Sequence, residues 1–165
     1  MSSQKRLAIL PGSYDPFTRG HAALARRAAL LFDRVVIAVM QNREKNYLFT
    51  REERVRIAEA SVADIPNAEV ISDDGLLVDL YQRIGACCVV KGIRNERDYV
   101  YEKKQAEWNR AHLDGFETLY LPAEEGLTAI SSTEVRKRLG DNAELCDLLT
   151  PEAERLVSEM RKSGN

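Results

Sequence analysis

Residues 7–21 of the chain are LAILPGSYDPFTRGH, and this stretch indicates how the fold begins. Its first four residues are apolar and precede Pro11-Gly12, which predicts a short buried strand that ends in a turn. Apolar residues then recur four and three positions apart, at Leu24, Ala28 and Leu31. That spacing predicts one apolar face of a helix. We therefore expect a strand, a loop and a helix in that order.

The rest of the sequence alternates short apolar runs with helical ones. Further strands are expected at residues 35–39, 68–72, 87–90 and 118–121. Helices are expected from Thr50, over residues 76–84 and 96–112, and from Ser131 and Thr150-Pro151. This alternation predicts an α/β fold with a doubly wound, five-stranded parallel sheet of Rossmann type. Ligands bind such sheets beyond the carboxyl ends of the strands, so the functional residues are expected there.

Two of the expected helices begin with the pattern of a capping box. In this motif a hydroxyl and a glutamate satisfy each other's backbone N–H groups. The pattern pairs Thr50 with Glu53 and Ser131 with Glu134. Both helices should therefore begin at these hydroxyl residues.

The size and charge of the chain limit its function classes. With 165 residues, the chain fits one domain over residues 1–165. A net charge of −2 argues against nucleic acid as a partner, because surfaces that bind it are normally basic. No apolar run approaches the ~20 residues that span a bilayer, so no membrane association is expected. Three cysteines without disulfide or metal-ligand spacing favour the cytoplasm.

The loop between the first strand and the first helix is a candidate phosphate site. Gly12 permits a tight turn, Ser13 offers a hydroxyl, and Gly20 lets a ligand approach the backbone. His21 falls on the first helical turn, where unpaired N–H groups attract anions. However, neither G-x-x-x-x-G-K-[ST] nor G-x-G-x-x-G is present. An ordinary strand–turn–helix connection explains the same residues.

The same loop carries a T-x-G-H motif, Thr18-Arg19-Gly20-His21. Together with PGSYDP at residues 11–16, the motif resembles the signature of nucleotidyltransferases and, within them, of the phosphopantetheine adenylyltransferase family. Tyr14 departs from the phenylalanine that is usual in that family. We expect its hydroxyl near the nucleotide.

A second segment, KGIRNERDYVYE at residues 91–102, follows the expected fourth strand. Lys91 and Arg94 suit a polyanionic group, and Gly92 lets the backbone come close to it. A solvated start of a charged helix is the alternative. The segment resembles the family pattern K/R-G-[LI]-R-x-x-x-D-[FY]-x-x-E, in which arginine is frequent at the position of Lys91. Relatives that use nicotinamide mononucleotide or glycerol phosphate are not expected to share it.

A third segment, ISSTEVR at residues 130–136, follows the expected fifth strand and opens a helix. Its hydroxyls and unpaired N–H groups suit an anion, although an ordinary capped helix accounts for the same pattern. Related nucleotidyltransferases carry a similar run, so this segment resembles the superfamily rather than one family. The three segments occur in the family's order within residues 7–139.

The resemblance implies transfer of the adenylyl group of ATP to 4′-phosphopantetheine, which gives dephospho-coenzyme A and pyrophosphate. The catalytic residues that it implies are His21, Lys45, Ser13 and Arg94. Those implied for ATP are Ser13, Tyr14, His21, Gly92, Arg94, Asp98, Glu102, Ile130, Ser131, Ser132 and Thr133. Those implied for the acceptor are Ser13, Lys45, Leu76, Leu77, Lys91 and Asn109. No protein ligand to a metal is implied, and Mg²⁺ is expected to bridge the phosphate oxygens of ATP.

The resemblance also implies a single nucleotidyltransferase domain with C-terminal helices, a homohexamer, and coenzyme A as a feedback inhibitor. Two other functions stay open. One is a related nucleotidyltransferase that uses nicotinamide mononucleotide or glycerol 3-phosphate, and the other is a catalytically silent nucleotide-binding domain. For Leu76 and Leu77, packing in the core is the alternative to contact with the acceptor.

Overall fold

A five-stranded sheet forms the centre of the computed structural model, which describes residues 5–42 and 44–163. Its strands are β1 (Leu7–Gly12), β2 (Arg34–Met40), β3 (Ala68–Asp73), β4 (Cys88–Ile93) and β5 (Thr118–Pro122). Their order across the sheet is β3-β2-β1-β4-β5, and all neighbouring strands are parallel. Strands β2 and β3 thus lie on one side of β1. The chain then crosses back, and β4 and β5 lie on the other side. This order confirms the doubly wound sheet.

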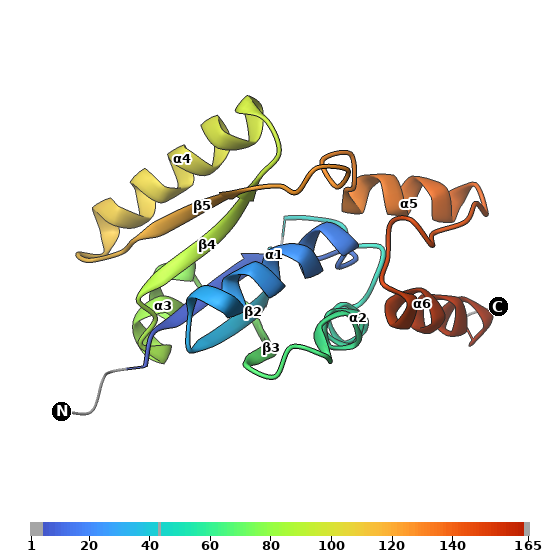
Figure 1. Ribbon diagram of the computed structural model, residues 1–165, viewed down its shortest axis with the longest axis horizontal. Coiled ribbons are helices and arrows are strands. Elements are labelled where there is room, and N and C mark those ends of the chain that lie inside the picture. Colours follow the sequence, from blue (N-terminus) through green and yellow to red (C-terminus); the bar gives the residue numbers. More distant parts are fainter. Residues whose placement is uncertain (1–4, 43, 164–165) are drawn as a thin grey trace.

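Six helices accompany the sheet in the described residues (Figure 1). They are α1 (Arg19–Leu31), α2 (Arg51–Val62), α3 (Leu77–Ile84), α4 (Glu96–His112), α5 (Ser132–Gly140) and α6 (Pro151–Ser163). None of these described helices has the length and apolar character needed to cross a membrane.

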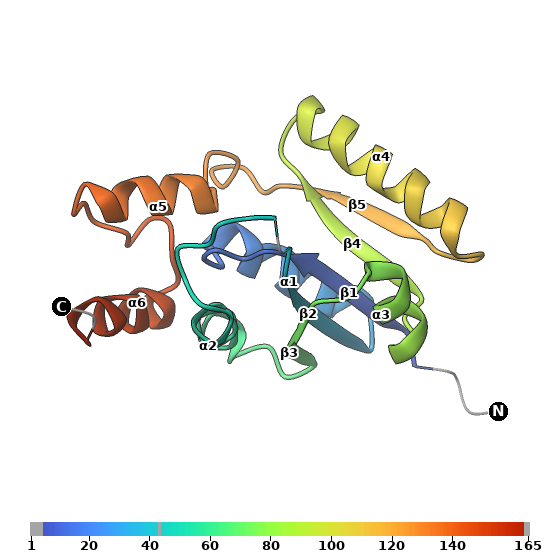
Figure 2. The same ribbon diagram turned by 180° about the vertical axis from the view of Figure 1, so that it is seen from behind.

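The helices bury both faces of the sheet. α1, α2, α5 and α6 contribute to one apolar cluster, and α3 contributes to a second cluster on the opposite face (Figures 1 and 2). The side chains of β1 alternate between the two, with Ala8 and Leu10 in the first cluster and Leu7 and Ile9 in the second. Because both faces are covered, ligands reach the sheet at the ends of its strands.

All five strands extend further than expected toward the edge where ligands bind, β1 and β4 by more than one residue. Pro11-Gly12 does not end β1, since both residues continue the ladder opposite Ala38 and Val39 of β2. Similarly, β4 continues past Val90 to Ile93. A strand's last residues depend on the register of its neighbours, which local turn signals do not reveal.

The buried face of α1 also differs from the expected one. Leu31 is 45% exposed, whereas Ala22, Ala25 and Ala28 are buried. Alanine has the smallest apolar side chain available, so this face lets α1 lie close against the sheet. Leu24 is half-buried and lines the cavity described below.

One capping box is complete and the other is half formed. Glu53 N donates to Thr50 Oγ1 at 3.2 Å, and Thr50 N donates to Glu53 Oε2 at 2.8 Å, as expected. At α5, Glu134 N donates to Ser131 Oγ at 3.1 Å, but the Glu134 carboxylate accepts from Arg138 Nε at 3.1 Å instead. The i,i+4 arginine has displaced the return bond of the second box.

Candidate active site

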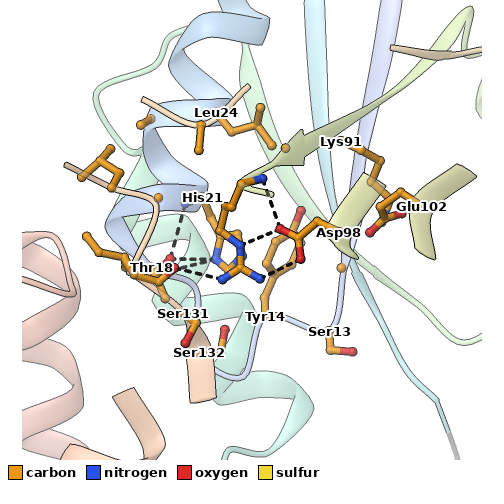
Figure 3. A pocket seen from close by; sticks show the side chains of 18 of the residues that line it. Ser13, Tyr14, Thr18, His21, Leu24, Lys91, Asp98, Glu102, Ser131 and Ser132 are labelled. Atoms are coloured by element: carbon orange, nitrogen blue, oxygen red, sulfur yellow. Dashed lines mark hydrogen bonds and ion pairs between the residues drawn. The ribbon is translucent and has the colours of Figure 1, made fainter. Parts of the chain in front are cut away.

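A cavity of about 460 Å³ opens at the carboxyl ends of β1, β4 and β5 (Figure 3). Many residues implied by the sequence line it: Ser13, Tyr14, His21, Lys45, Lys91, Gly92, Arg94, Asp98, Glu102, Ile130, Ser131, Ser132 and Thr133. Three motifs that are far apart in the chain therefore meet in one place. The structure therefore brings these residues together around one cavity. The role of each residue in binding or catalysis stays a prediction.

The loop after β1 is fixed by the packing of Tyr14 on Gly12. Tyr14 adopts a φ of 50°, a left-handed conformation that is uncommon outside glycine. Its ring lies so close to Gly12 that an added Cβ would be 2.8 Å from Tyr14 Cζ. The Tyr14 hydroxyl donates to Leu10 O at 2.8 Å, and burial and the Glu102 carboxylate raise the pKa of the phenol. The hydroxyl expected near the nucleotide therefore donates to the backbone of β1.

His21 belongs to the cap of α1. Thr18 is the N-cap residue, and its backbone N–H donates to His21 Nδ1 at 3.0 Å. In return, His21 N donates to Thr18 Oγ1 at 3.4 Å. The histidine thus occupies the position that glutamate takes in an ordinary capping box.

The cap determines the protonation of the imidazole. Because Nδ1 accepts a hydrogen bond from Thr18 N–H, a neutral ring carries its proton on Nε2. Burial and the positive charges of Arg94 and Lys91 lower the pKa of His21 to about 4. His21 is therefore a neutral hydrogen-bond donor at pH 7.

The opposite wall of the cavity consists of ion pairs at the start of α4. Arg94 donates from Nε to Asp98 Oδ2 at 2.8 Å and from Nη2 to Asp98 Oδ1 at 3.2 Å. Its hydrogen bonds lower the pKa of Asp98. Lys91 Nζ lies 3.2 Å from Glu102 Oε1 and 3.1 Å from Oε2. Both cations therefore have carboxylate partners that also hold their side chains in place.

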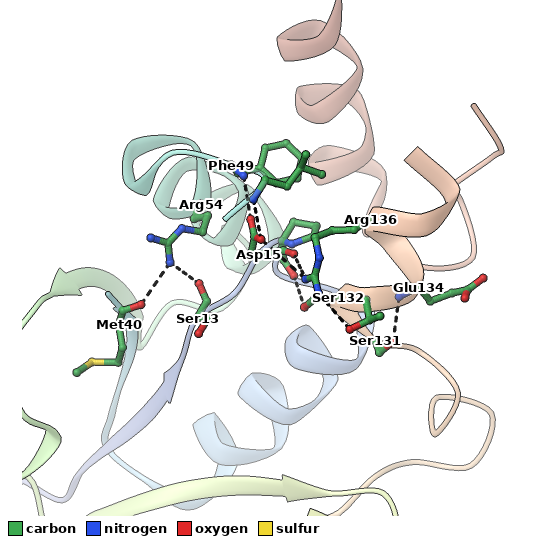
Figure 4. A network of polar contacts seen from close by, with 12 residues as sticks. Ser13, Asp15, Met40, Phe49, Arg54, Ser131, Ser132, Glu134 and Arg136 are labelled. Carbon is green, nitrogen blue, oxygen red and sulfur yellow. Dashed lines mark hydrogen bonds and ion pairs between the residues drawn. The ribbon is translucent and has the colours of Figure 1, made fainter. Parts of the chain in front are cut away.

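The start of α5 forms a third side of the cavity. Ser132 Oγ donates to Pro16 O at 2.8 Å, and Arg136 donates to Asp15 O at 2.7 Å and to Thr133 Oγ1 at 3.1 Å (Figure 4). These side-chain contacts dock α5 on the loop after β1. The N-termini of α1 and α5 consequently face one cavity, where the positive ends of the two helix dipoles favour anions.

Lys45 reaches the cavity from the loop after β2. Its side chain is exposed and lines the cavity edge, and its backbone N–H donates to Asn42 O at 3.1 Å. Lys45 and Ser13 therefore line the same cavity.

Three implied acceptor residues do not line this cavity: Leu76, Leu77 and Asn109. Leu76 is 56% exposed before α3, and Leu77 packs against the second apolar cluster. Asn109 is buried near the end of α4. Contact of these residues with the acceptor stays a prediction, and core packing describes Leu77 in the structure.

The cavity also contains residues that the sequence analysis missed. Leu24 lies against Gly92, 3.3 Å from the position of an added Cβ, and Arg27 donates to Pro122 O at 2.5 Å. Both line the cavity together with Thr18. His21, Leu24 and Arg27 are spaced by three residues in a helix, and that periodicity was an available signal for one shared face.

Comparison with known proteins agrees with these motifs. The chain matches the cytidylyltransferase-like family model over residues 9–138. A phosphopantetheine adenylyltransferase of Staphylococcus carnosus is 38% identical over 152 residues, which are 92% of this chain and 94% of the relative. Another from Azoarcus sp. is 45% identical over 136 residues, which are 81% of this chain and 83% of the relative.

A solved structure shares the fold. It is a Vibrio parahaemolyticus protein provisionally assigned as a nicotinate-nucleotide adenylyltransferase, with a TM-score of 0.71. The match covers 94% of this chain and 93% of that chain at 17% sequence identity. At so low an identity, the match shows only that the two proteins share a fold. The two phosphopantetheine adenylyltransferases decide the family of this chain, because they match most of it at much higher identity than the solved structure does. The chain belongs to the phosphopantetheine adenylyltransferase family.

Proposed function

We propose that the protein transfers the adenylyl group of ATP to 4′-phosphopantetheine, forming dephospho-coenzyme A and pyrophosphate. The observation that carries the proposal is the composition of one cavity. It joins a neutral histidine donor, two helix N-termini and the cations Lys45, Lys91 and Arg94. Such a site suits the meeting of two phosphorylated substrates.

The reaction needs positioning more than proton transfer. A phosphate oxygen of 4′-phosphopantetheine attacks the α-phosphorus of ATP and forms the new P–O bond. The bond from the α-phosphorus to the bridging oxygen breaks, and its electrons leave with pyrophosphate. Because the nucleophile is already an anion, no side-chain nucleophile or strong base is required. Catalysis then depends on alignment and on stabilisation of charge.

Each wall of the cavity has a part in this scheme. His21 Nε2–H donates to an α-phosphate oxygen as negative charge develops there. Ser13, Lys45 and Lys91 hold the acceptor phosphate. Arg94 and the start of α5 at Ser131, Ser132 and Thr133 hold the departing phosphates, and Ile130 O accepts from Arg94 Nη1 at 3.5 Å.

The remaining implied residues support these contacts. Asp98 and Glu102 orient Arg94 and Lys91 through the ion pairs described above. Gly92 gives ATP access to the backbone of β4, and Tyr14 shapes the loop under the nucleotide. Mg²⁺ would be carried on the phosphate oxygens of ATP, where it would neutralise part of their negative charge.

A panel of acceptors tests the proposal. Purified protein is incubated with ATP, Mg²⁺ and one acceptor at a time, and pyrophosphate and the adenylylated product are measured. We expect dephospho-coenzyme A from 4′-phosphopantetheine and no comparable product from nicotinamide mononucleotide or glycerol 3-phosphate. Turnover of nicotinamide mononucleotide without turnover of phosphopantetheine would favour the fold-level relative instead. No turnover with any acceptor, despite ATP binding, would favour a silent nucleotide-binding domain.

We also propose a homohexamer in the cytoplasm that coenzyme A inhibits. Coenzyme A contains the pantetheine and adenylate parts of the product, so it suits the same cavity. The cysteines Cys87, Cys88 and Cys146 are free thiols, in keeping with a reducing compartment. Light scattering tests the assembly, and competition between coenzyme A and ATP in the pyrophosphate assay tests the inhibition.

A further inference from the structure

Arg54 is a buried charged residue that does not line the cavity. It lies on α2, is 1% exposed, and donates from Nη1 to Ser13 O at 2.6 Å and to Met40 O at 3.3 Å (Figure 4). Nη2 donates to Gln41 Oε1, and the guanidinium carbon lies 4.0 Å from the centre of the Tyr47 ring. A single side chain thus connects the loop after β1 with the loop after β2.

The loop after β2 is organised around these contacts. Asn42 N donates to Tyr47 Oη at 2.8 Å, which closes the loop. Lys45 N then donates to Asn42 O at 3.1 Å within the closed turn. Arg54 contacts both ends of this turn, at Gln41 and at Tyr47. The position of the Lys45 backbone therefore depends on the guanidinium.

Core packing alone does not explain a guanidinium at this position. Removing a charged group from water is costly unless it is well paired. The hydrogen-bond acceptors of Arg54 are carbonyl and amide oxygens, and Nε is buried without a partner. Burial lowers the pKa of Arg54 accordingly. The planar guanidinium of Arg54 holds several acceptors in fixed positions at the same time, which an apolar side chain could not do.

A second connection makes the loss of Arg54 testable. The buried Asp15 carboxylate accepts from Leu48 N and Phe49 N, each at 2.9 Å. The two loops would therefore stay attached without Arg54, while the part that carries Lys45 would be free to shift. We expect misplacement of this segment rather than unfolding of the sheet.

We propose that Arg54 is a positioning residue for the acceptor phosphate, which fixes Ser13 and the Lys45 turn relative to each other. The inference rests on the proposed function, because Ser13 and Lys45 are two of the three groups assigned there to the acceptor phosphate. Ser13 is implied for both substrates, and the other groups assigned to ATP lie in the loop after β1, on β4 and on α1, α4 and α5. Apart from the Ser13 carbonyl, Arg54 contacts none of these groups in the described hydrogen bonds. The two substrates should therefore respond differently to its replacement.

The test is steady-state kinetics of Arg54→Lys with each substrate varied in turn. Lysine keeps the charge but loses the fork. We expect KM for 4′-phosphopantetheine to rise and kcat to fall by about tenfold each, the effect of one charge-assisted hydrogen bond. KM for ATP should stay within about twofold, below the effect of one such bond. Arg56→Lys, an exposed arginine on the same helix, is the matched control and should behave like the wild type.

Two milder variants keep the proposal testable if Arg54→Lys does not fold. Gln41→Met removes one acceptor, and Tyr47→Leu removes the ring under the guanidinium. Both should raise KM for the acceptor selectively. Equal increases in both KM values, or a lower melting temperature with both KM values unchanged, would overturn the positioning role. Wild-type protein without activity on phosphopantetheine would instead overturn the proposed function itself.

Discussion

The two sides of the cavity hold their functional groups in different ways. On the α1 side, Thr18 and Tyr14 are buried and His21 is held by neutral hydrogen bonds from its own helix cap. On the α4 side, Lys91 and Arg94 are partly exposed and bound to carboxylates. One side is fixed by packing, and the other by ion pairs, of which Arg94–Asp98 is the more exposed and Lys91–Glu102 the more buried.

This difference matches two chemical tasks. A donor to a developing charge is effective when its protonation and direction are set before the reaction, as burial and the cap set those of His21. Phosphates that arrive and leave need cations that can change partners. Ion pairs at a partly exposed surface contribute little to stability, so rearranging them costs little. The comparison predicts a large effect when the donor on the α1 side is replaced and a small one when a carboxylate that orients the cations on the α4 side is replaced.

Replacement of His21 by alanine should have the largest effect. Loss of one donor to a transition-state oxyanion lowers kcat by about 10²–10³-fold, or roughly 3–4 kcal/mol. ATP affinity, measured by calorimetry, should change little, because the imidazole stabilises charge that develops later. His112→Ala, the exposed histidine on α4, is the control and should keep full activity. Normal turnover of His21→Ala would remove the fixed donor from the mechanism.

Gly12→Ala tests the packing beneath that donor. The added methyl would lie 2.8 Å from the Tyr14 ring, so the loop must shift. We expect the free energy of unfolding in urea to fall by about 1–3 kcal/mol, the usual range for overpacking. Gly140→Ala adds a methyl with no atom within 4 Å and should leave stability unchanged or slightly raised. Equal stability of the two variants would contradict a tightly packed α1 side.

Asp98→Asn tests the ion-paired side. The variant weakens the two-point contact that orients Arg94, so KM for ATP should rise, by less than about fivefold because such partly exposed pairs contribute roughly 1 kcal/mol or less. The value of kcat should stay near that of the wild type. Glu96→Gln removes an exposed carboxylate from the same helical turn and serves as the control. A hundredfold loss of kcat in Asp98→Asn would mean that both sides are equally rigid.

Protonation of His21 should have the smallest effect on kcat, and it should lower the free energy of unfolding more clearly. Since the pKa of His21 is about 4, its protonation should not reduce kcat between pH 8 and 5. The unfolded histidine has its ordinary pKa near 6.5, so the unfolded chain binds the extra proton first. Stability associated with His21 is thus present above pH 6.5 and declines toward pH 4. Urea unfolding at pH 7 and 5 should show a larger loss for wild type than for His21→Gln.

The sequence allowed prediction of the topology and of the place of the site. Parallel strands that are buried on both faces appear in the sequence as short apolar runs, so each strand can be recognised by itself. The loops that follow the carboxyl ends of these strands are where ligands bind. The three motifs each follow such a run, which is why their residues meet. Leu76, Leu77 and Asn109 were implied by resemblance alone, and the cavity does not include them.

The missed features depend on contacts between segments distant in the chain. Arg54 lies in the polar sequence TREER, where an exposed helical arginine would be expected. Only the folded positions of Ser13 O and Met40 O make it a buried connection. The strained φ of Tyr14 likewise follows from its packing on Gly12 and is not visible in residue order. In contrast, the Thr18 cap could have been predicted from the T-x-x-H spacing.

The protonation of His21 tests the comparison of the two sides most directly. Nitrogen-15 NMR of ring-labelled protein at pH 7, with His112→Ala used for assignment, reports the proton on each imidazole nitrogen. The structure predicts a neutral His21 ring with its proton on Nε2 and with Nδ1 accepting from Thr18 in the protein without ATP. An imidazolium at pH 7, or a proton on Nδ1, would contradict the account of a fixed neutral donor.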